Sequence, residues 1–203
     1  MAIYEVMAVS VHDLAHQLGQ YAALNPQGLP PVHLWDPPFC GDMDLRIARD
    51  GQWYYMGSPI RRLPLVKLFS RVLKRGDDGE YYLVTPVEKL RIQVEDAPFV
   101  VSLVDRVFID GRQDLIMTTL TEEVFKVDEN HQIWVDIDPI SGEPSPYVHV
   151  RSRLHARIGR NPFYQLVAWG EEKEHISLPN RRILDVSSAG IDFLIAEYPV
   201  EPE

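Results

Sequence analysis

The fold is decided by a stretch that reads Phe39-Cys40-Gly41-Asp42-Met43-Asp44-Leu45-Arg46-Ile47, then Arg49-Asp50-Gly51-Gln52-Trp53-Tyr54-Tyr55, then Gly57-Ser58-Pro59-Ile60-Arg61-Arg62. The pattern predicts two strands, Met43–Ala48 and Trp53–Met56. Asp50-Gly51 between them is a strong hairpin signal, because glycine accepts the positive φ that tight hairpin turns require. A helix should follow, with Pro64 in its first turn and one apolar face formed by Leu65, Leu68, Phe69, Val72 and Leu73.

The segments on either side complete an α+β chain with two subdomains. Residues 1–88 should form a leading helix (Val11–Leu24), the hairpin, the basic amphipathic helix and a strand (Tyr81–Thr85). Residues 89–203 should form a bent antiparallel sheet or partial barrel, with a helix over Pro162–Trp169 and a β-rich end. Its strands are expected at Leu90–Val94, Phe99–Phe108, Leu115–Leu120, Val124–Val127, Ile133–Ile137, Tyr147–Val150 and Leu154–Ile158.

A faint internal repeat supports two related subdomains. Arg62 to Phe69 aligns with Arg160 to Val167, and a hairpin with a tryptophan soon after its turn precedes each copy. The repeat predicts a duplicated hairpin–helix–strand unit, although the spacing differs between the copies and chance similarity is the alternative.

Composition narrows the function classes. The 203 residues carry a net charge of −10, which argues against a binder of nucleic-acid polymers. No apolar run approaches the roughly 20 residues that span a bilayer, and no basic segment marks a secretory signal. Cys40 is the single cysteine, which excludes an internal disulfide and favours a reducing compartment. We therefore expect a cytoplasmic protein that does not bind membranes.

Four motifs resemble the bacterial family of unknown function numbered 1285. They are Cys40 to Ile47, Gly57-Ser58-Pro59-Ile60, Leu83 to Lys89, and Val94 to Phe99, within a resemblance from about Pro31 to Leu166. The resemblance implies two related subdomains, the second loosely like a pleckstrin-homology barrel. It also implies a nucleotide-like ligand at their interface and a role in bacterial signalling, but no activity. The C-terminal end departs from the family pattern.

Two carboxylates stand out as candidates for chemistry. Asp42 and Asp44 are separated by one residue, so on a strand they share a face. With Glu88 they could hold a divalent metal for phosphoester hydrolysis, since Mg²⁺ and Ca²⁺ take oxygen ligands. The alternative is that they cap turns or pair with Arg46 and Arg61.

An anion site is the hypothesis that the basic residues favour. Ser58 and Arg61 precede a predicted helix, and a helix N-terminus offers unpaired N–H groups and partial positive charge. Arg46 and Arg151 belong to two clusters of basic residues that could serve the same ligand; the alternative is that both clusters are simply solvated. Asp42 or Asp44 would then orient an arginine or contact ribose.

The sequence therefore predicts a non-enzymatic module with two partners, a small anionic, nucleotide-like ligand and a signalling protein. No catalytic residue, metal site or cofactor is assigned. The candidate ligand-binding residues are Asp42, Asp44, Arg46, Ser58, Arg61, Glu88 and Arg151. The alternatives are the metal-assisted hydrolase and a protein-interaction module that presents an edge strand or groove.

Overall fold

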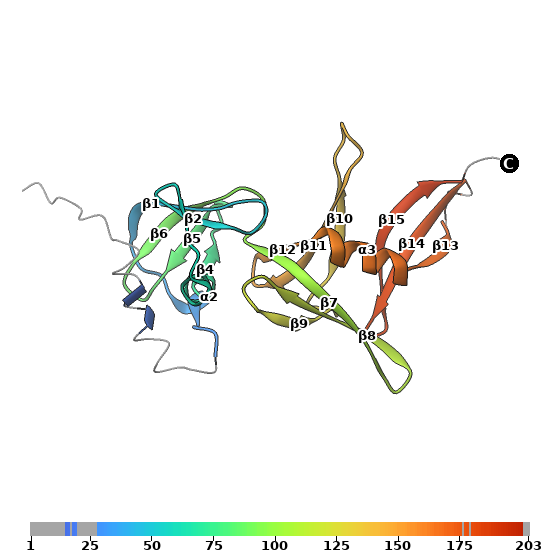
Figure 1. Ribbon diagram of the computed structural model, residues 1–203, viewed down its shortest axis with the longest axis horizontal. Helices are drawn as coiled ribbons and strands as arrows, with labels where there is room; N and C mark the ends of the chain where they lie inside the picture. Colours follow the sequence, from blue (N-terminus) through green and yellow to red (C-terminus); the bar gives the residue numbers. More distant parts are fainter. Residues whose placement is uncertain (1–14, 17, 20–27, 176, 179, 201–203) are drawn as a thin grey trace, which may run out of the picture. The chain divides into compact units, whose positions relative to one another are not determined.

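The computed structural model describes residues 15–16, 18–19, 28–175, 177–178 and 180–200, which form two compact units, Met1–Asp96 and Ala97–Glu203 (Figure 1). The described part is mostly β-structure with two α-helices, so the predicted α+β chain of two subdomains is confirmed in part. The predicted helix Val11–Leu24 lies mainly outside the described residues. The unit boundary falls after Asp96, further along than the predicted position at Glu88, because β6 (Lys89–Val94) pairs with two strands of the first unit.

The N-terminal unit is built on a six-stranded mixed sheet in the order β3-β2-β1-β6-β5-β4. β1 and β6 run parallel, and the other neighbours are antiparallel. A short 3₁₀-helix, η1 (Val32–Leu34), precedes the sheet. The remaining elements are β1 (Phe39–Ile47), β2 (Trp53–Tyr55), β3 (Ser58–Pro59), α2 (Leu63–Ser70), β4 (Leu73–Arg75) and β5 (Tyr81–Val84).

Local sequence signals explain the first half of this unit. Gly51 has a φ of 85° in the turn between β1 and β2, so the predicted hairpin is confirmed. Pro64 occupies the first turn of α2, as predicted. The helix ends at Ser70, however, and Leu73 begins β4. The helix is therefore shorter than predicted, and Val72 and Leu73 do not belong to its apolar face. Phe69 of α2 is fully buried and stacks on Trp53, with 6.5 Å between ring centroids.

The C-terminal unit contains a second six-stranded mixed sheet and a three-stranded antiparallel sheet. The first has the order β10-β11-β12-β7-β8-β9, and the second has the order β13-β14-β15. Most of the predicted strands are confirmed, but the larger sheet is not wholly antiparallel, because β7 and β12 run parallel. The elements are β7 (Phe99–Ile109), β8 (Arg112–Thr119), β9 (Val124–Lys126), β10 (Ile133–Ile137), β11 (Pro144–Arg151), β12 (Leu154–Ile158), α3 (Arg160–Trp169), β13 (Glu171–Glu174), β14 (Arg181–Ser188) and β15 (Ile191–Pro199).

The two large sheets share one strand order. Each consists of two three-stranded meanders joined through a parallel pair, β1 with β6 in one unit and β7 with β12 in the other. The predicted hairpin–helix–strand repeat does not follow this order. It aligned α2 with α3, yet α2 lies between the two meanders of its unit and α3 follows the last strand of its sheet.

Candidate ligand site in the N-terminal unit

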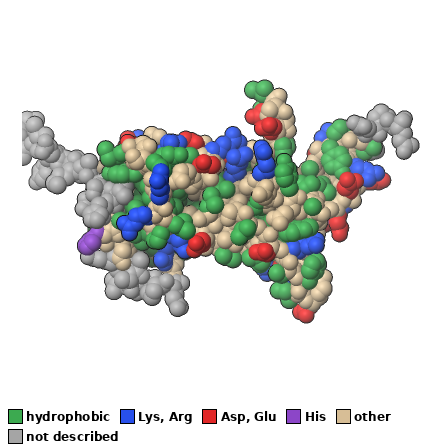
Figure 2. Space-filling view, in the orientation of Figure 1, with side chains coloured by type: hydrophobic (Ala, Val, Ile, Leu, Met, Phe, Trp, Pro, Cys, Tyr) green, Lys and Arg blue, Asp and Glu red, His purple; other side chains and the backbone are tan. Residues whose placement is uncertain are grey.

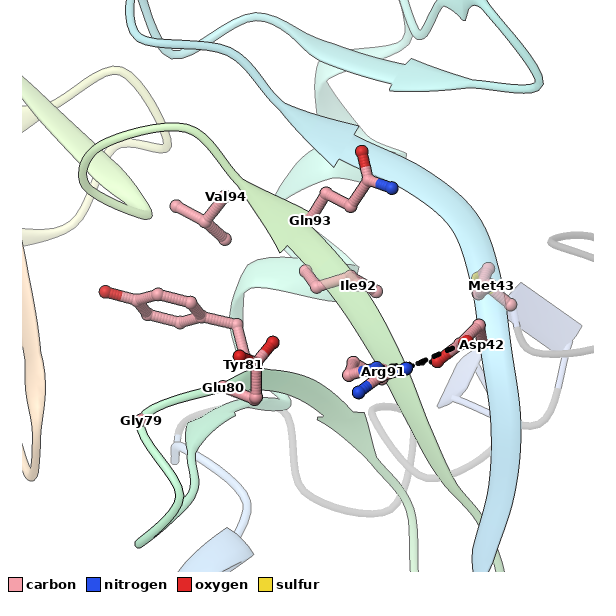
Figure 3. A pocket seen from close by; sticks show the side chains of 9 residues that line it. All are labelled: Asp42, Met43, Gly79, Glu80, Tyr81, Arg91, Ile92, Gln93 and Val94. Atoms are coloured by element: carbon pink, nitrogen blue, oxygen red, sulfur yellow. Dashed lines mark hydrogen bonds and ion pairs between the residues drawn. The ribbon is translucent and has the colours of Figure 1, made fainter.

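A polar pocket of about 450 Å³ opens beside strands β1, β5 and β6 of the N-terminal unit (Figure 3). Figure 3 shows Asp42 and Arg91 on one side of the pocket and Tyr81 and Val94 on the other. Its lining residues are Asp42, Met43, Gly79, Glu80, Tyr81, Arg91, Ile92, Gln93 and Val94. Strands therefore supply most of the wall, which makes the position of each side chain depend on strand register.

The register of the parallel pair brings Asp42 and Arg91 together. The two residues are direct partners between β1 and β6, so their side chains leave the sheet on the same face. Arg91 donates two hydrogen bonds to the carboxylate, from Nε at 2.6 Å and from Nη2 at 2.9 Å. This forked contact lowers the pKa of Asp42 below its ordinary value and raises the pKa of Arg91. Asp42 therefore fixes the orientation of the guanidinium.

The remaining polar groups of the pocket are free to meet a ligand. Among the described residues, the side chains of Glu80 and Gln93 make no hydrogen bond or ion pair. Burial raises the pKa of the Tyr81 phenol, so it stays protonated. The buried side chains of Met43 and Ile92 add an apolar part to the wall. The pocket thus offers one guanidinium, two carboxylates and an amide, while the Tyr81 ring leaves the sheet on the same face as its strand partner Ile92.

The other predicted site residues of this unit lie outside the pocket lining. Asp44 is exposed in an irregular part of β1, where the register against β6 shifts between Asp42 and Arg46. Arg46 forms an ion pair with Glu95 and lies over the ring of Tyr54, 4.4 Å from its centroid. Its guanidinium is therefore already engaged.

Ser58 and Arg61 are both exposed, and neither side chain contacts another described residue through a hydrogen bond or ion pair. Ser58 belongs to β3, and α2 begins only at Leu63 with no side-chain cap. Glu88 lies between β5 and β6, where its Oε2 is buried without a hydrogen-bond partner in the described part of the chain.

Arg151 belongs to the C-terminal unit. It forms an ion pair with Glu123 and lies over the ring of Phe99, 4.9 Å from the centroid. No group of three histidine, cysteine or acidic side chains in the described ranges could hold a metal ion. Asp42, Asp44 and Glu88 therefore do not form the metal cluster that the hydrolase alternative requires.

Sequence reasoning missed Arg91, Glu80 and Gln93. Arg91 and Gln93 stand on the polar face of an alternating strand, Leu90 to Val94, and that strand was predicted. What the sequence did not show was which strand pairs with it. No local signal shows that β6 lies parallel to β1, so nothing in the sequence brought Arg91 to Asp42.

Family comparisons agree with the two-unit architecture. Residues 30–97 match the N-terminal domain of a domain of unknown function, DUF1285, and residues 98–195 match the C-terminal domain of the same family. The chain belongs to the DUF1285 family. No curated protein matches it.

Two solved DUF1285 structures are similar to this chain. A protein from Silicibacter pomeroyi DSS-3 is 42% identical, with a TM-score of 0.79, over 93% of this chain and 95% of that chain. A protein from Shewanella baltica OS155 is 31% identical, with a TM-score of 0.49, over 62% of this chain and 91% of its own. No helix in the described residues is long and apolar enough to cross a membrane.

Proposed function

We propose that this DUF1285 protein is a non-enzymatic module that binds a small, nucleotide-like ligand in the pocket of its N-terminal unit. The observation that carries the proposal is the guanidinium of Arg91, which Asp42 holds in a fixed orientation at the pocket wall. A planar, oriented guanidinium is well suited to a phosphate or carboxylate oxygen. The volume of about 450 Å³ falls within the usual range for small-molecule sites.

The charges of the pocket restrict the ligand further. One guanidinium faces two carboxylates, Asp42 and Glu80, so the pocket is net negative and would repel a polyphosphate. A ligand with a single negative group suits it better, such as the monoanionic phosphodiester of a cyclic or dinucleotide messenger. Hydroxyl groups of a sugar can donate to Glu80, while the Gln93 amide can both donate and accept.

A place in signalling completes the proposal. The six-stranded sheet of the C-terminal unit is followed directly by helix α3, which supports a pleckstrin-homology-like interpretation of that unit. We infer a cytoplasmic role in which ligand binding by one unit is part of a signalling function. The interpretation as a hydrolase receives no support from the geometry of its three carboxylates.

A thermal-shift screen tests the ligand class directly. The panel contains nucleosides, cyclic mononucleotides, dinucleotides, nucleoside triphosphates and divalent metals. A ligand at 100 times its Kd adds about 2.7 kcal/mol of stability. We expect phosphodiester monoanions to stabilise the protein and triphosphates to do so less. A triphosphate or metal that gives the largest shift would contradict the proposed ligand chemistry.

Three variants then separate the candidate sites. Arg91→Gln should abolish the ligand-induced shift, while Glu95→Gln is the matched control, since Glu95 pairs with Arg46 on the same sheet outside the pocket lining. Arg61→Ala tests the phosphate site predicted from the sequence. Loss of binding in Arg61→Ala together with normal binding in Arg91→Gln would move the site away from this pocket.

A further inference from the structure

A second, apolar groove lies within the C-terminal unit. Its volume is about 350 Å³, and it is lined by Ile133, Trp134, Val135, Ile137, Arg181, Leu194, Ile195, Ala196 and Glu197. Successive side chains of a strand point to opposite faces. A groove lined by consecutive residues of both β10 and β15 therefore runs along the edges of these strands rather than over one face of a sheet.

Both strands are sheet edges. Among the described strands, β10 pairs only with β11 and β15 pairs only with β14. Cα atoms of β10 and β15 approach within 8 Å, but no backbone hydrogen bond joins the two strands. The sheet edges that face the groove thus carry backbone groups without a strand partner, which is the setting in which an extended segment can be added.

The hydrogen-bond pattern identifies which backbone groups are available on β10. Along the hairpin, the N–H of His149 donates to Gln132 O at 2.9 Å, and the N–H of Asp138 donates to Glu143 O at 3.0 Å. Bonded pairs alternate along an antiparallel ladder, so residues 134 and 136 also bond toward β11. The backbone N–H and C=O groups of Val135 and Ile137 consequently point toward the free edge.

The hairpin beside this edge is acidic and apolar. Asp136 and Glu143 are exposed and form no ion pair with a described residue. Arg181, the cation of the groove, is already paired with Glu197. Figure 1 shows the β10–β11 hairpin projecting from the unit, and Figure 2 shows acidic and apolar side chains on it. A complementary occupant would therefore be basic as well as apolar.

The projecting end is also ordered by its own hydrogen bonds. The Asp138 carboxylate accepts from the N–H groups of Ile140 and Ser141, at 2.9 and 2.7 Å. These contacts fix the loop that presents Ile140, whose side chain is 96% exposed. Ile137, at the outer end of β10, is 58% exposed. Apolar surface is thus held in solvent next to an unpaired strand edge.

We propose that the groove binds an extended segment of a partner protein, in which apolar and basic residues alternate. The segment adds as a strand to the outer part of β10, through Val135 and Ile137. Its apolar side chains lie on the face of the strand that carries Val135 and Ile137, and its lysine or arginine side chains lie on the opposite face, near Asp136 and Glu143. This function is separate from the ligand site, which belongs to the other unit.

The first test uses the full chain and a short, acetylated peptide of alternating valine and lysine. Binding is followed by NMR, at the backbone amides of Val135 and Ile137 and the indole of Trp134. Three control peptides separate the contributions: glutamate replaces lysine, serine replaces valine, or alternate backbone nitrogens are methylated. We expect the parent peptide to bind and each control peptide to bind at least about 10-fold more weakly.

Variants of the chain locate the site. Val135→Pro removes an outward N–H without touching the β10–β11 ladder, because proline is tolerated on a strand edge. We expect Val135→Pro and Ile137→Ser each to weaken peptide binding about 10-fold or more. Val124→Ser, an exposed change on β9, is the matched control and should bind normally. Thermal melting of every variant confirms that it is folded.

Several outcomes would overturn the proposal. Equal binding by Val135→Pro and by the unchanged chain would exclude strand addition at β10. Tighter binding of the glutamate peptide would refute the charge argument, and equal binding of the methylated peptide would refute backbone pairing. Absence of binding by the parent peptide at millimolar concentration would remove this partner class altogether.

Discussion

Replacement of Ser188 by alanine should destabilise the C-terminal unit, because it removes hydrogen bonds that join its two sheets. Ser188 lies on β14 and its side chain has no exposed surface. Its Oγ donates to the carbonyl oxygen of Val127 at 2.6 Å and accepts from the N–H of Leu115 at 2.9 Å. One hydroxyl therefore satisfies two backbone groups of the larger sheet region, and Ser188→Ala leaves both without this partner.

The magnitude follows from the cost of buried, unsatisfied polar groups. Each such group costs about 1–3 kcal/mol, and two are created by one substitution. We expect a loss of about 3 kcal/mol, which corresponds to a fall in Tm of roughly 14 °C for a unit of about 100 residues. Ser187→Ala is a matched control, because Ser187 is the neighbouring residue and its hydroxyl bonds the exposed carboxylate of Asp192. Its cost should stay below about 1 kcal/mol.

Urea denaturation measures the effect on the free energy of unfolding, and native-state hydrogen exchange measures it at a single amide. Unfolding curves give the free energy, and the two units are followed separately because they need not unfold together. Exchange at the Leu115 amide reports the lost bond itself and should accelerate strongly in Ser188→Ala. A difference of less than about 0.5 kcal/mol between the two serine variants, or unchanged protection at Leu115, would refute the reasoning.

Three further expectations concern the core, the pocket and pH. Phe69→Ala should lower the free energy of unfolding by about 3–5 kcal/mol, measured in urea, because the ring is fully buried. Arg91→Gln should raise the pKa of Asp42 back toward its ordinary value of 3.8, measured by NMR titration of the carboxyl carbon. Burial tends to raise the pKa of Asp128, but hydrogen bonds such as that with His131 outweigh it and lower the pKa. This stabilisation is present above pH 3.8 and is lost as the pH falls through the folded pKa, so Asp128→Asn should flatten the acid limb of a urea-stability profile.

The parts of the fold that the sequence predicted well depend on local chemistry. Asp50-Gly51 and Pro64 act within a few residues of themselves, so the hairpin and the start of α2 could be assigned without tertiary information. The end of α2 could not, since the helical spacing of apolar residues continues to Leu73. Tertiary pairing with Leu83 places Leu73 in a strand instead. Local periodicity was overridden by a sheet partner that lies farther along the chain.

Strand pairing between distant parts of the chain also explains why the candidate site was predicted only in part. Asp42 was recognised from its spacing to Asp44, but its partner Arg91 is brought to it only by the parallel pairing of β1 and β6. The sequence also did not show which acidic residues pair with the basic ones. In the structure Arg46 and Arg151 each pair with a glutamate, and neither lines the pocket, whereas Arg91 does. Charge clusters in sequence do not reveal which charges neutralise one another in the fold.

The shared strand order of the two large sheets does not give the units a shared binding surface. In the N-terminal unit, α2 is inserted between the meanders, and the edge strands β3 and β4 are short. In the C-terminal unit, the chain continues past the sheet through α3 into β13–β15. This addition brings β15 beside β10 and creates the groove. Because the groove depends on β15, which has no counterpart in the N-terminal sheet, a ligand found for one unit would not predict the ligand of the other. The Arg91 and Val135 variants should therefore affect their respective ligands independently.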